Sequence, residues 1–131
     1  VFAYNEFYKQ KILRKMRGVG PAYFTKLIFF FGDQTGLIMD QWTARSTNLL
    51  LNVILIKLTS NKNVDEKNSQ HVYVKYLNFI SELKTTLSID SDSKTEELIF
   101  SCSHVKSTVI KRLGQHHQAC SAWRKHVVEN T

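Results

Sequence analysis

Apolar side chains recur at three- and four-residue steps along most of the chain, the spacing that places them on one face of an α-helix. The clearest repeat lies in residues 4–16, and a more strongly apolar segment follows in residues 22–31. Further helices are predicted over residues 41–51, 70–87, 93–102, 104–113 and 119–128. No internal repeat marks a second unit, so the pattern predicts one all-α domain, a helical bundle over residues 1–131.

Two breaks frame the second of these helices. Residues 17–21, Arg-Gly-Val-Gly-Pro, permit a tight turn because glycine reaches backbone conformations that are closed to other residues, and Pro21 suits the first turn of a helix. Gly32 is expected to end the helix. Residues 37–39, Leu-Ile-Met, are then predicted to be a short buried stretch that leads to Asp40.

The middle of the chain offers weaker signals. The helix of residues 41–51 is predicted to face inward through Ala44, Leu49 and Leu50. Residues 53–58 are apolar and predicted to be buried, and their periodicity is compatible either with a continuation of this helix or with a short strand. Residues 93–96, Ser-Lys-Thr-Glu, have the spacing of a capping box and are predicted to open the next helix.

The net charge of +7 is concentrated at the two ends of the chain. Residues 1–31 hold six Lys and Arg and one acid, and residues 102–131 hold five and one. This distribution favours a polyanionic partner such as nucleic acid; an anionic membrane, another protein or a merely solubilising surface are the alternatives. No segment has the roughly 20 apolar residues of a membrane span, and two cysteines make no disulfide scaffold. We therefore expect no membrane partner and a cytoplasmic location, on the nucleoid if the source is bacterial.

The glycine turn is the candidate phosphate site. The first turn of a helix carries unpaired N–H donors and a partial positive charge, so a turn at this point can present its backbone to an anion. Lys15 and Arg17 stand beside the turn and would add contacts that hold a nucleic acid backbone without reading its sequence. The predicted DNA-binding residues here are Lys15, Arg17, Gly18, Val19 and Gly20.

Residues 18–27, GVGPAYFTKL, followed by residues 40–45, DQWTAR, resemble the helix-hairpin-helix DNA glycosylases. Within that superfamily they are similar to the branch called 8-oxoguanine DNA glycosylase-like, or OGG-like, proteins. The resemblance places the hairpin motif at residues 12–31 and a segment carrying the catalytic aspartate at residues 37–50. It implies a helical fold around that hairpin, with the whole chain forming either one domain or one lobe of a longer protein.

This resemblance implies excision of a base from double-stranded DNA that contains oxidised guanine or another modified purine. In that reaction the hairpin holds phosphates while the damaged nucleotide is flipped into a pocket. By the same resemblance Asp40 stabilises the positive charge that develops on the sugar, or activates the nucleophile, and Arg45 adds a DNA contact. Asp40 is also well placed to cap the helix at Gln41, and both roles can hold together. Tyr23, Gln41 and Trp42 are the candidate base-pocket residues.

The chain departs from the family pattern at one informative position. Ala22 occupies the place where members with AP lyase activity carry a nucleophilic lysine. Lys26 lies one helical turn further on the same face and would be either a replacement nucleophile or an ordinary surface lysine. The alternative to a glycosylase is a catalytically reduced OGG-like nucleic-acid-binding module, as in bacterial defence systems. Only about 17 residues precede the hairpin, so either a segment lies outside this chain or the base pocket is reduced.

No metal site is predicted. The candidate zinc ligands are Cys102, His104, His116, His117 and Cys120, and their spacing matches no standard zinc module. The family resemblance allows a monovalent cation at the hairpin and implies no other cofactor.

Overall fold

The structure is a computed structural model that describes residues 1–13, 15, 16, 18–32, 36–101 and 122–131. Its helices are α1 (Phe2–Ile12), α2 (Pro21–Phe31), α3 (Gln41–Leu51), α4 (Gln70–Leu87), α5 (Asp92–Ser101) and α6 (Ala122–Asn130). Within these residues the β-structure is limited to an isolated bridge between Leu58 and Val64. The all-α prediction is therefore confirmed, while the helix predicted over residues 104–113 lies outside the described residues. In the same part of the chain, no helix has the length and apolar character needed to cross a membrane.

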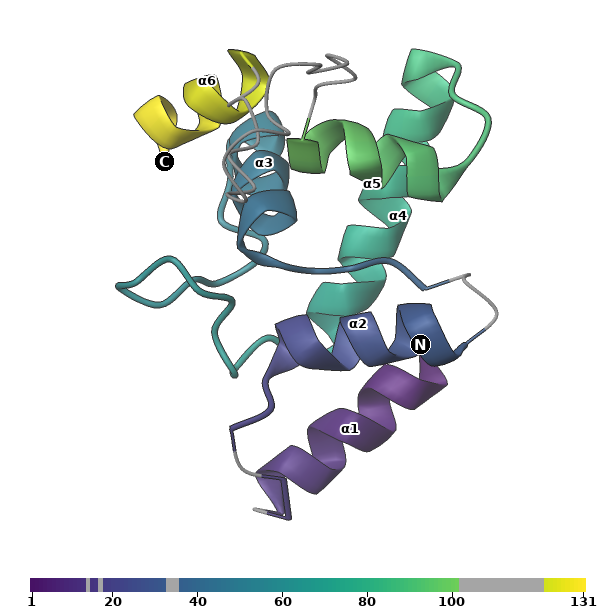
Figure 1. Cartoon of the computed structure of the whole chain (residues 1–131), viewed down its shortest axis with the longest axis vertical. Coiled ribbons are helices and arrows are strands. Elements are labelled where there is room, and N and C mark those ends of the chain that lie inside the picture. The colour runs from purple at the N-terminus through teal and green to yellow at the C-terminus, as the bar shows by residue number, and fades with distance from the viewer. Residues whose placement is uncertain (14, 17, 33–35, 102–121) are drawn as a thin grey trace, which may run out of the picture.

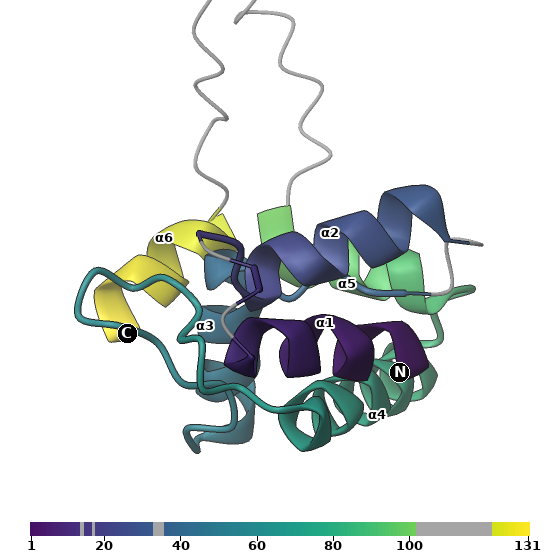
Figure 2. The ribbon, with the colours of Figure 1, turned by 90° about the horizontal axis from the view of Figure 1, so that it is seen from below.

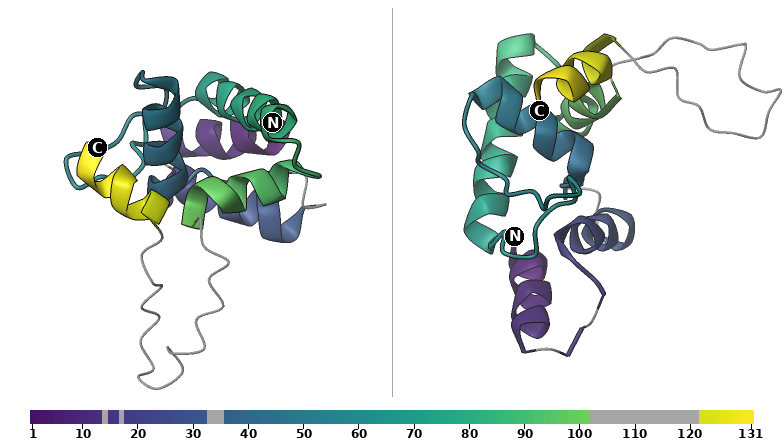
Figure 3. Two further views of the ribbon diagram at one scale, coloured as in Figure 1. Left: turned by 90° about the horizontal axis from the view of Figure 1, so that it is seen from above. Right: turned by 90° about the vertical axis from the view of Figure 1, so that its left-hand side faces the viewer.

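Helix α4 is the longest helix and connects the two ends of the molecule (Figure 1). At one end α1 packs between α2 and α4, as the view from below shows (Figure 2). At the other end α5 packs on α3 and α4, and α6 lies beside α3 and α5, far from α1 (Figure 3). Residues 36–40, which lead into α3, pass between these two groups of helices (Figure 1).

Stacked aromatic rings join the helices at the α1 end. Tyr4 is fully buried, and its ring lies 4.5 Å from the ring of Tyr73 on α4 and 6.0 Å, edge to face, from that of Phe24 on α2. The Tyr4 hydroxyl donates a hydrogen bond to the carbonyl oxygen of Asn68 at 2.7 Å, so its polar end is also satisfied. Such ring pairs add about 0.5–1.5 kcal/mol each beyond the area they bury. The apolar stripe of α1 therefore does what its spacing predicts, although the helix ends at Ile12 and not at residue 16.

Helix α3 faces inward mainly with polar side chains, so the predicted inner face is only partly correct: Ala44 is fully buried, Leu49 is half-buried, and the prediction is wrong for Leu50. Its buried residues are Thr43, Ala44, Arg45, Ser46 and Thr47, whereas Leu50 is exposed. The reason lies in the partners of this face, which are backbone groups and side chains of α5 and α6. For example, the Ser46 hydroxyl donates to the carbonyl oxygen of Ile99 at 2.7 Å.

Residues 53–58 form neither a helix nor a strand. Helix α3 ends at Leu51, and its C-cap Asn52 takes the left-handed conformation at φ +52°. The Asn48 side chain then holds the following loop by accepting hydrogen bonds from the N–H groups of Leu55 and Ile56. Ile56 is buried, but Ile54 is 80% exposed, so the predicted burial of this segment is only partly correct.

Candidate functional site

The turn between α1 and α2 has the geometry that its glycines predict. Gly18 lies at φ +72°, a conformation that favours glycine, and a side chain there would meet open space. Gly20 is the N-cap of α2 with an extended backbone, and Pro21 is the first residue of the helix. The carbonyl oxygen of Gly20 accepts the N–H groups of Tyr23 and Phe24. Val19 is partly buried against the core. Phosphate binding at this turn, and a cation there, remain predictions.

The basic residues around the turn are partly neutralised by acids. A groove of about 620 Å³ lies beside the turn. Its lining residues are Tyr8, Lys11, Ile12, Met16, Gly18, Glu66 and Lys67. Within it the Lys11 ammonium pairs with the Glu66 carboxylate at 2.7 Å, and nearby Lys9 pairs with Glu6 at 2.8 Å. Lys15 is exposed. Arg17 lies outside the described residues.

Asp40 caps α3. Its Oδ1 accepts hydrogen bonds from the backbone N–H groups of Trp42 at 2.8 Å and Thr43 at 3.1 Å. The Thr43 hydroxyl accepts the Asp40 N–H at 2.9 Å, which completes a capping box. In the described part of the chain, every hydrogen bond found for the carboxylate ends on Oδ1. The cap therefore fixes the position of Asp40 through one of its two carboxylate oxygens.

The stretch before Asp40 is tied to two helices. The Thr25 hydroxyl on α2 accepts the Met39 N–H at 3.1 Å. The Tyr73 hydroxyl on α4 donates to the carbonyl oxygen of Leu37 at 2.9 Å and accepts its N–H at 3.1 Å. Leu37 and Met39 are buried, as predicted, and Ile38 between them faces a pocket. The backbone that carries Asp40 is thus held from both sides.

The predicted lysine nucleophile lies on the surface. Lys26 is exposed on α2, and its ammonium lies 5.9 Å from the centre of the exposed Tyr23 ring. Ala22, at the family's lysine position, is partly buried against the core. Among the described residues, no hydrogen bond or ion pair joins Lys26 to Asp40.

Arg45 and Trp42 are engaged in packing between α3 and α6. Arg45 is 8% exposed, and its Nε donates to the Thr131 hydroxyl at 2.7 Å. The Trp42 ring lies between two guanidinium groups, 5.0 Å from that of Arg45 and 4.4 Å from that of Arg124. Gln41 is half-buried at the start of α3. Tyr23 is exposed on α2, and the role of Tyr23, Gln41 and Trp42 in a base pocket remains a prediction.

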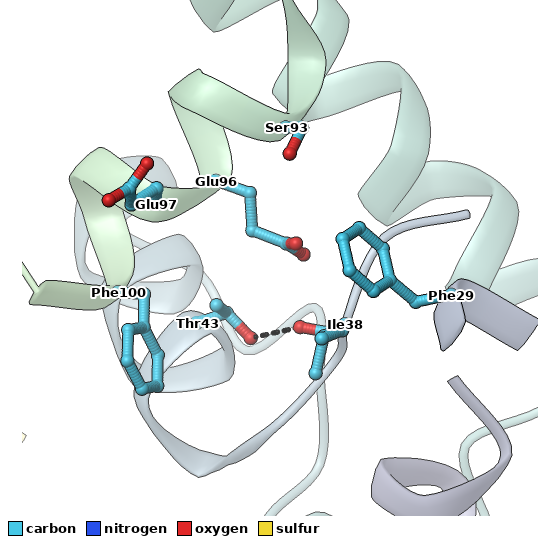
Figure 4. Close-up of a pocket in the computed structure, with 7 residues that line it drawn as sticks. All are labelled: Phe29, Ile38, Thr43, Ser93, Glu96, Glu97 and Phe100. Atoms are coloured by element: carbon cyan, nitrogen blue, oxygen red, sulfur yellow. Dashed lines mark hydrogen bonds between the residues drawn. The ribbon is translucent and has the colours of Figure 1, made fainter. Parts of the chain in front are cut away.

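A pocket of about 260 Å³ lies among α2, α3, α5 and the stretch before Asp40 (Figure 4). It is lined by Phe29, Ile38, Thr43, Ser93, Glu96, Glu97 and Phe100. The Glu96 carboxyl group points into the space beside Phe29, Ile38 and Thr43 (Figure 4). Phe29, Ile38 and Phe100 give this pocket an apolar part, and the buried carboxyl group beside them is its distinctive feature.

Glu96 is held by a short hydrogen bond in a buried position. It is 6% exposed, and the Tyr76 hydroxyl donates to its Oε1 at 2.5 Å. Burial raises the pKa of Glu96 to about 7; the bonds from Tyr76 and Ile38 oppose this, and the nearby charge of Asp40 adds to it. Glu96 can therefore exchange a proton near neutral pH.

The sequence pattern did not single out Glu96 as a site residue. Residues 93–96 were predicted to be a capping box, but α5 begins at Asp92, and it is Ser91 whose hydroxyl accepts the Lys94 N–H. The capping-box prediction is therefore wrong. Helical spacing does indicate that Glu96 is buried, because it lies three residues before the buried Ile99, on the apolar face of the helix.

No group of three metal-ligating side chains is found in the described ranges. The histidines and cysteines considered as zinc ligands, Cys102, His104, His116, His117 and Cys120, all lie outside these ranges.

Comparison with known families matches residues 1–100 to a family model described as "Putative 8-oxoguanine DNA glycosylase OGG-like protein". No curated protein gives a match, and no solved structure does. The matched span covers most of the chain and contains the glycine turn, Asp40 and Glu96. The resemblance first noted in residues 18–27 and 40–45 is thereby confirmed, and the chain belongs to the OGG-like family.

Proposed function

We propose that this chain is a DNA N-glycosylase that removes a modified purine, such as an oxidised guanine, from duplex DNA. The observation that carries the proposal is the position of Asp40. It lies on a backbone stretch whose neighbours Ile38 and Thr43 line a pocket, and only one of its oxygens is used by the cap. Membership of the OGG-like family supports the same reading.

In the proposed reaction the glycine turn and the exposed Lys15 hold the phosphate backbone, and the modified nucleotide leaves the stack. The bond between sugar and base then breaks while the Asp40 carboxylate stabilises the positive charge on the sugar. Ala22 carries no nucleophile and Lys26 faces solvent, which favours water as the attacking group. We therefore propose hydrolysis without a lysine–sugar intermediate.

The test is release of free base under single-turnover conditions from duplexes that contain 8-oxoguanine, hypoxanthine or 7-methylguanine. Asp40→Asn keeps a capping residue and removes the charge, so release is expected to fall about 100-fold, the scale measured when one transition-state charge contact is lost. Asp90→Asn, at an exposed aspartate, is the matched control and should leave the rate unchanged. If the wild-type chain releases none of these bases at high enzyme concentration, the proposal is wrong.

A second candidate function is a nucleic-acid-binding module without catalysis, and the absence of a lysine at Ala22 is the observation that favours it. Such a module would bind duplex DNA in a salt-dependent way, without base release, and with the same affinity after Asp40→Asn. Borohydride trapping separates the two forms of the enzyme. A Lys26-dependent cross-link would show a lysine nucleophile, and we expect no cross-link in either the wild type or Lys26→Gln.

A further inference from the structure

Glu96 is a buried carboxyl group with no role in the reaction described so far. It lies in a pocket next to Phe29 and Ile38 (Figure 4). The Tyr76 hydroxyl donates a hydrogen bond to it. Burying an ionisable carboxyl group costs more free energy than burying the neutral amide of glutamine or an apolar side chain. A position like this in a pocket is where functional acids are found.

We propose that Glu96 is the general acid that protonates the departing base, while Asp40 acts on the sugar. This inference rests on the proposed glycosylase function. The bond from the sugar C1′ to N9 of the purine breaks, its electron pair goes to the base, and the Glu96 proton passes to a ring nitrogen of the base. Water adds to C1′ and gives a proton to the free oxygen of Asp40, from which solvent returns a proton to Glu96. The sum is nucleotide plus water giving free base and an abasic sugar.

The surroundings of Glu96 suit this role. The titratable groups near it are Tyr73 and Tyr76 from α4, Asp40 from the stretch before α3, and Glu97, which lines the same pocket from α5. Helices α2 and α3 contribute the neutral Phe29 and Thr43. Burial raises the pKa of Tyr73 to about 12 and that of Tyr76 well above its ordinary value, so both remain hydrogen-bond donors near pH 7.

A general acid works best when its pKa is close to the working pH, because it must be protonated before the transfer and give up its proton readily. Burial raises the pKa of Glu96 to about 7. The nearby charge of Asp40 also raises the pKa of Glu96, so the two carboxyl groups are suited to different tasks.

The charge of the leaving base provides the test. 7-Methylguanine is already cationic in DNA and leaves without a proton, whereas 8-oxoguanine and hypoxanthine leave as neutral bases that need one. Glu96→Gln is expected to slow release of the neutral bases by about 100-fold or more, the usual scale of general acid catalysis, and that of 7-methylguanine by less than about 3-fold. Asp40→Asn should slow all three, since the sugar charge is common to them. Glu82→Gln, an exposed glutamate on α4, is the control and should slow none.

The pH profile gives a second measurement that does not need Glu96→Gln to fold. For the neutral bases the wild-type rate should be level below about pH 7 and fall about tenfold per pH unit above it, and 7-methylguanine should show no such fall. Tyr76→Phe removes a bond that lowers the pKa of Glu96, so the fall should move to higher pH. Equal loss for cationic and neutral bases in Glu96→Gln, or identical pH profiles for them, overturns the assignment while leaving the glycosylase in place. No release of any base by the wild type overturns the glycosylase itself, and the assignment with it.

Discussion

Burial of Glu96 should make the stability of the protein depend on pH, and replacing it with glutamine removes that dependence. Its pKa is about 7 in the folded chain against an ordinary value of 4.5, so the folded state binds the proton more tightly. Between these values, stability therefore falls as pH rises, and the full cost is present above about pH 7. Each tenfold difference in proton affinity is about 1.4 kcal/mol, so the cost amounts to about 3 kcal/mol.

Urea unfolding of the wild type and Glu96→Gln between about pH 5 and pH 8 measures this effect. The free energy of unfolding of the variant should rise relative to that of the wild type by roughly 1 kcal/mol for each pH unit up to about pH 7. Above that pH the difference should stay constant. Glutamine keeps an oxygen for the Tyr76 hydroxyl and loses the second one, which adds an offset that is the same at every pH. Glu82→Gln should follow the wild type throughout. A wild-type-to-variant difference that is constant across this range would refute the reasoning, because it would mean that Glu96 ionises in the folded chain as it does in water.

Three further outcomes are expected from single substitutions. Asp40→Asn should change the free energy of unfolding by less than about 1 kcal/mol, because asparagine also caps helices; a larger loss in chemical denaturation would make the carboxylate a structural group. Glu66→Gln should free Lys11 and tighten binding of duplex DNA, with a salt dependence steeper by about one counterion in fluorescence anisotropy; an unchanged slope would place this ion pair away from the DNA. Thr25→Val should cost about 1–3 kcal/mol in thermal unfolding because it leaves the buried N–H of Met39 without its acceptor, and a cost below about 0.5 kcal/mol would contradict that role.

Features that depend on neighbouring residues could be predicted from the sequence. The glycines and Pro21 before an apolar run locate the turn and the start of α2, and the structure has both where expected. The cap formed by Asp40 follows in the same way, since its partners Trp42 and Thr43 lie two and three residues away. In these cases the interacting groups fall within one turn of chain, so their spacing fixes their geometry.

Features that join distant segments could not be predicted in this way. Counting charges along residues 1–31 made that end strongly basic, but Glu66 approaches from 55 residues away to pair with Lys11. The environment of Glu96 depends on Tyr76, 20 residues earlier on another helix, and on the backbone of Ile38. The polar inner face of α3 has the same cause, because Ser46 is buried against a carbonyl group of α5. Periodicity reports which face is apolar, but it does not identify the partner that makes a polar group suitable for burial.

The two carboxyl groups of the candidate site are joined through one short backbone segment. Ile38 lines the pocket beside Glu96, its carbonyl oxygen accepts the Thr43 hydroxyl at 2.9 Å, and the Thr43 N–H donates to Asp40. One segment therefore carries Asp40 and forms part of the wall around Glu96, and hydrogen bonds from Thr25 and Tyr73 tie it to α2 and α4. Burial sets the proton affinity of Glu96, and the end of a helix, with its partial positive charge, positions Asp40. If the proposed glycosylase function holds, such a pair would break the bond between sugar and base with water as the attacking group, and the site would not need a lysine at position 22.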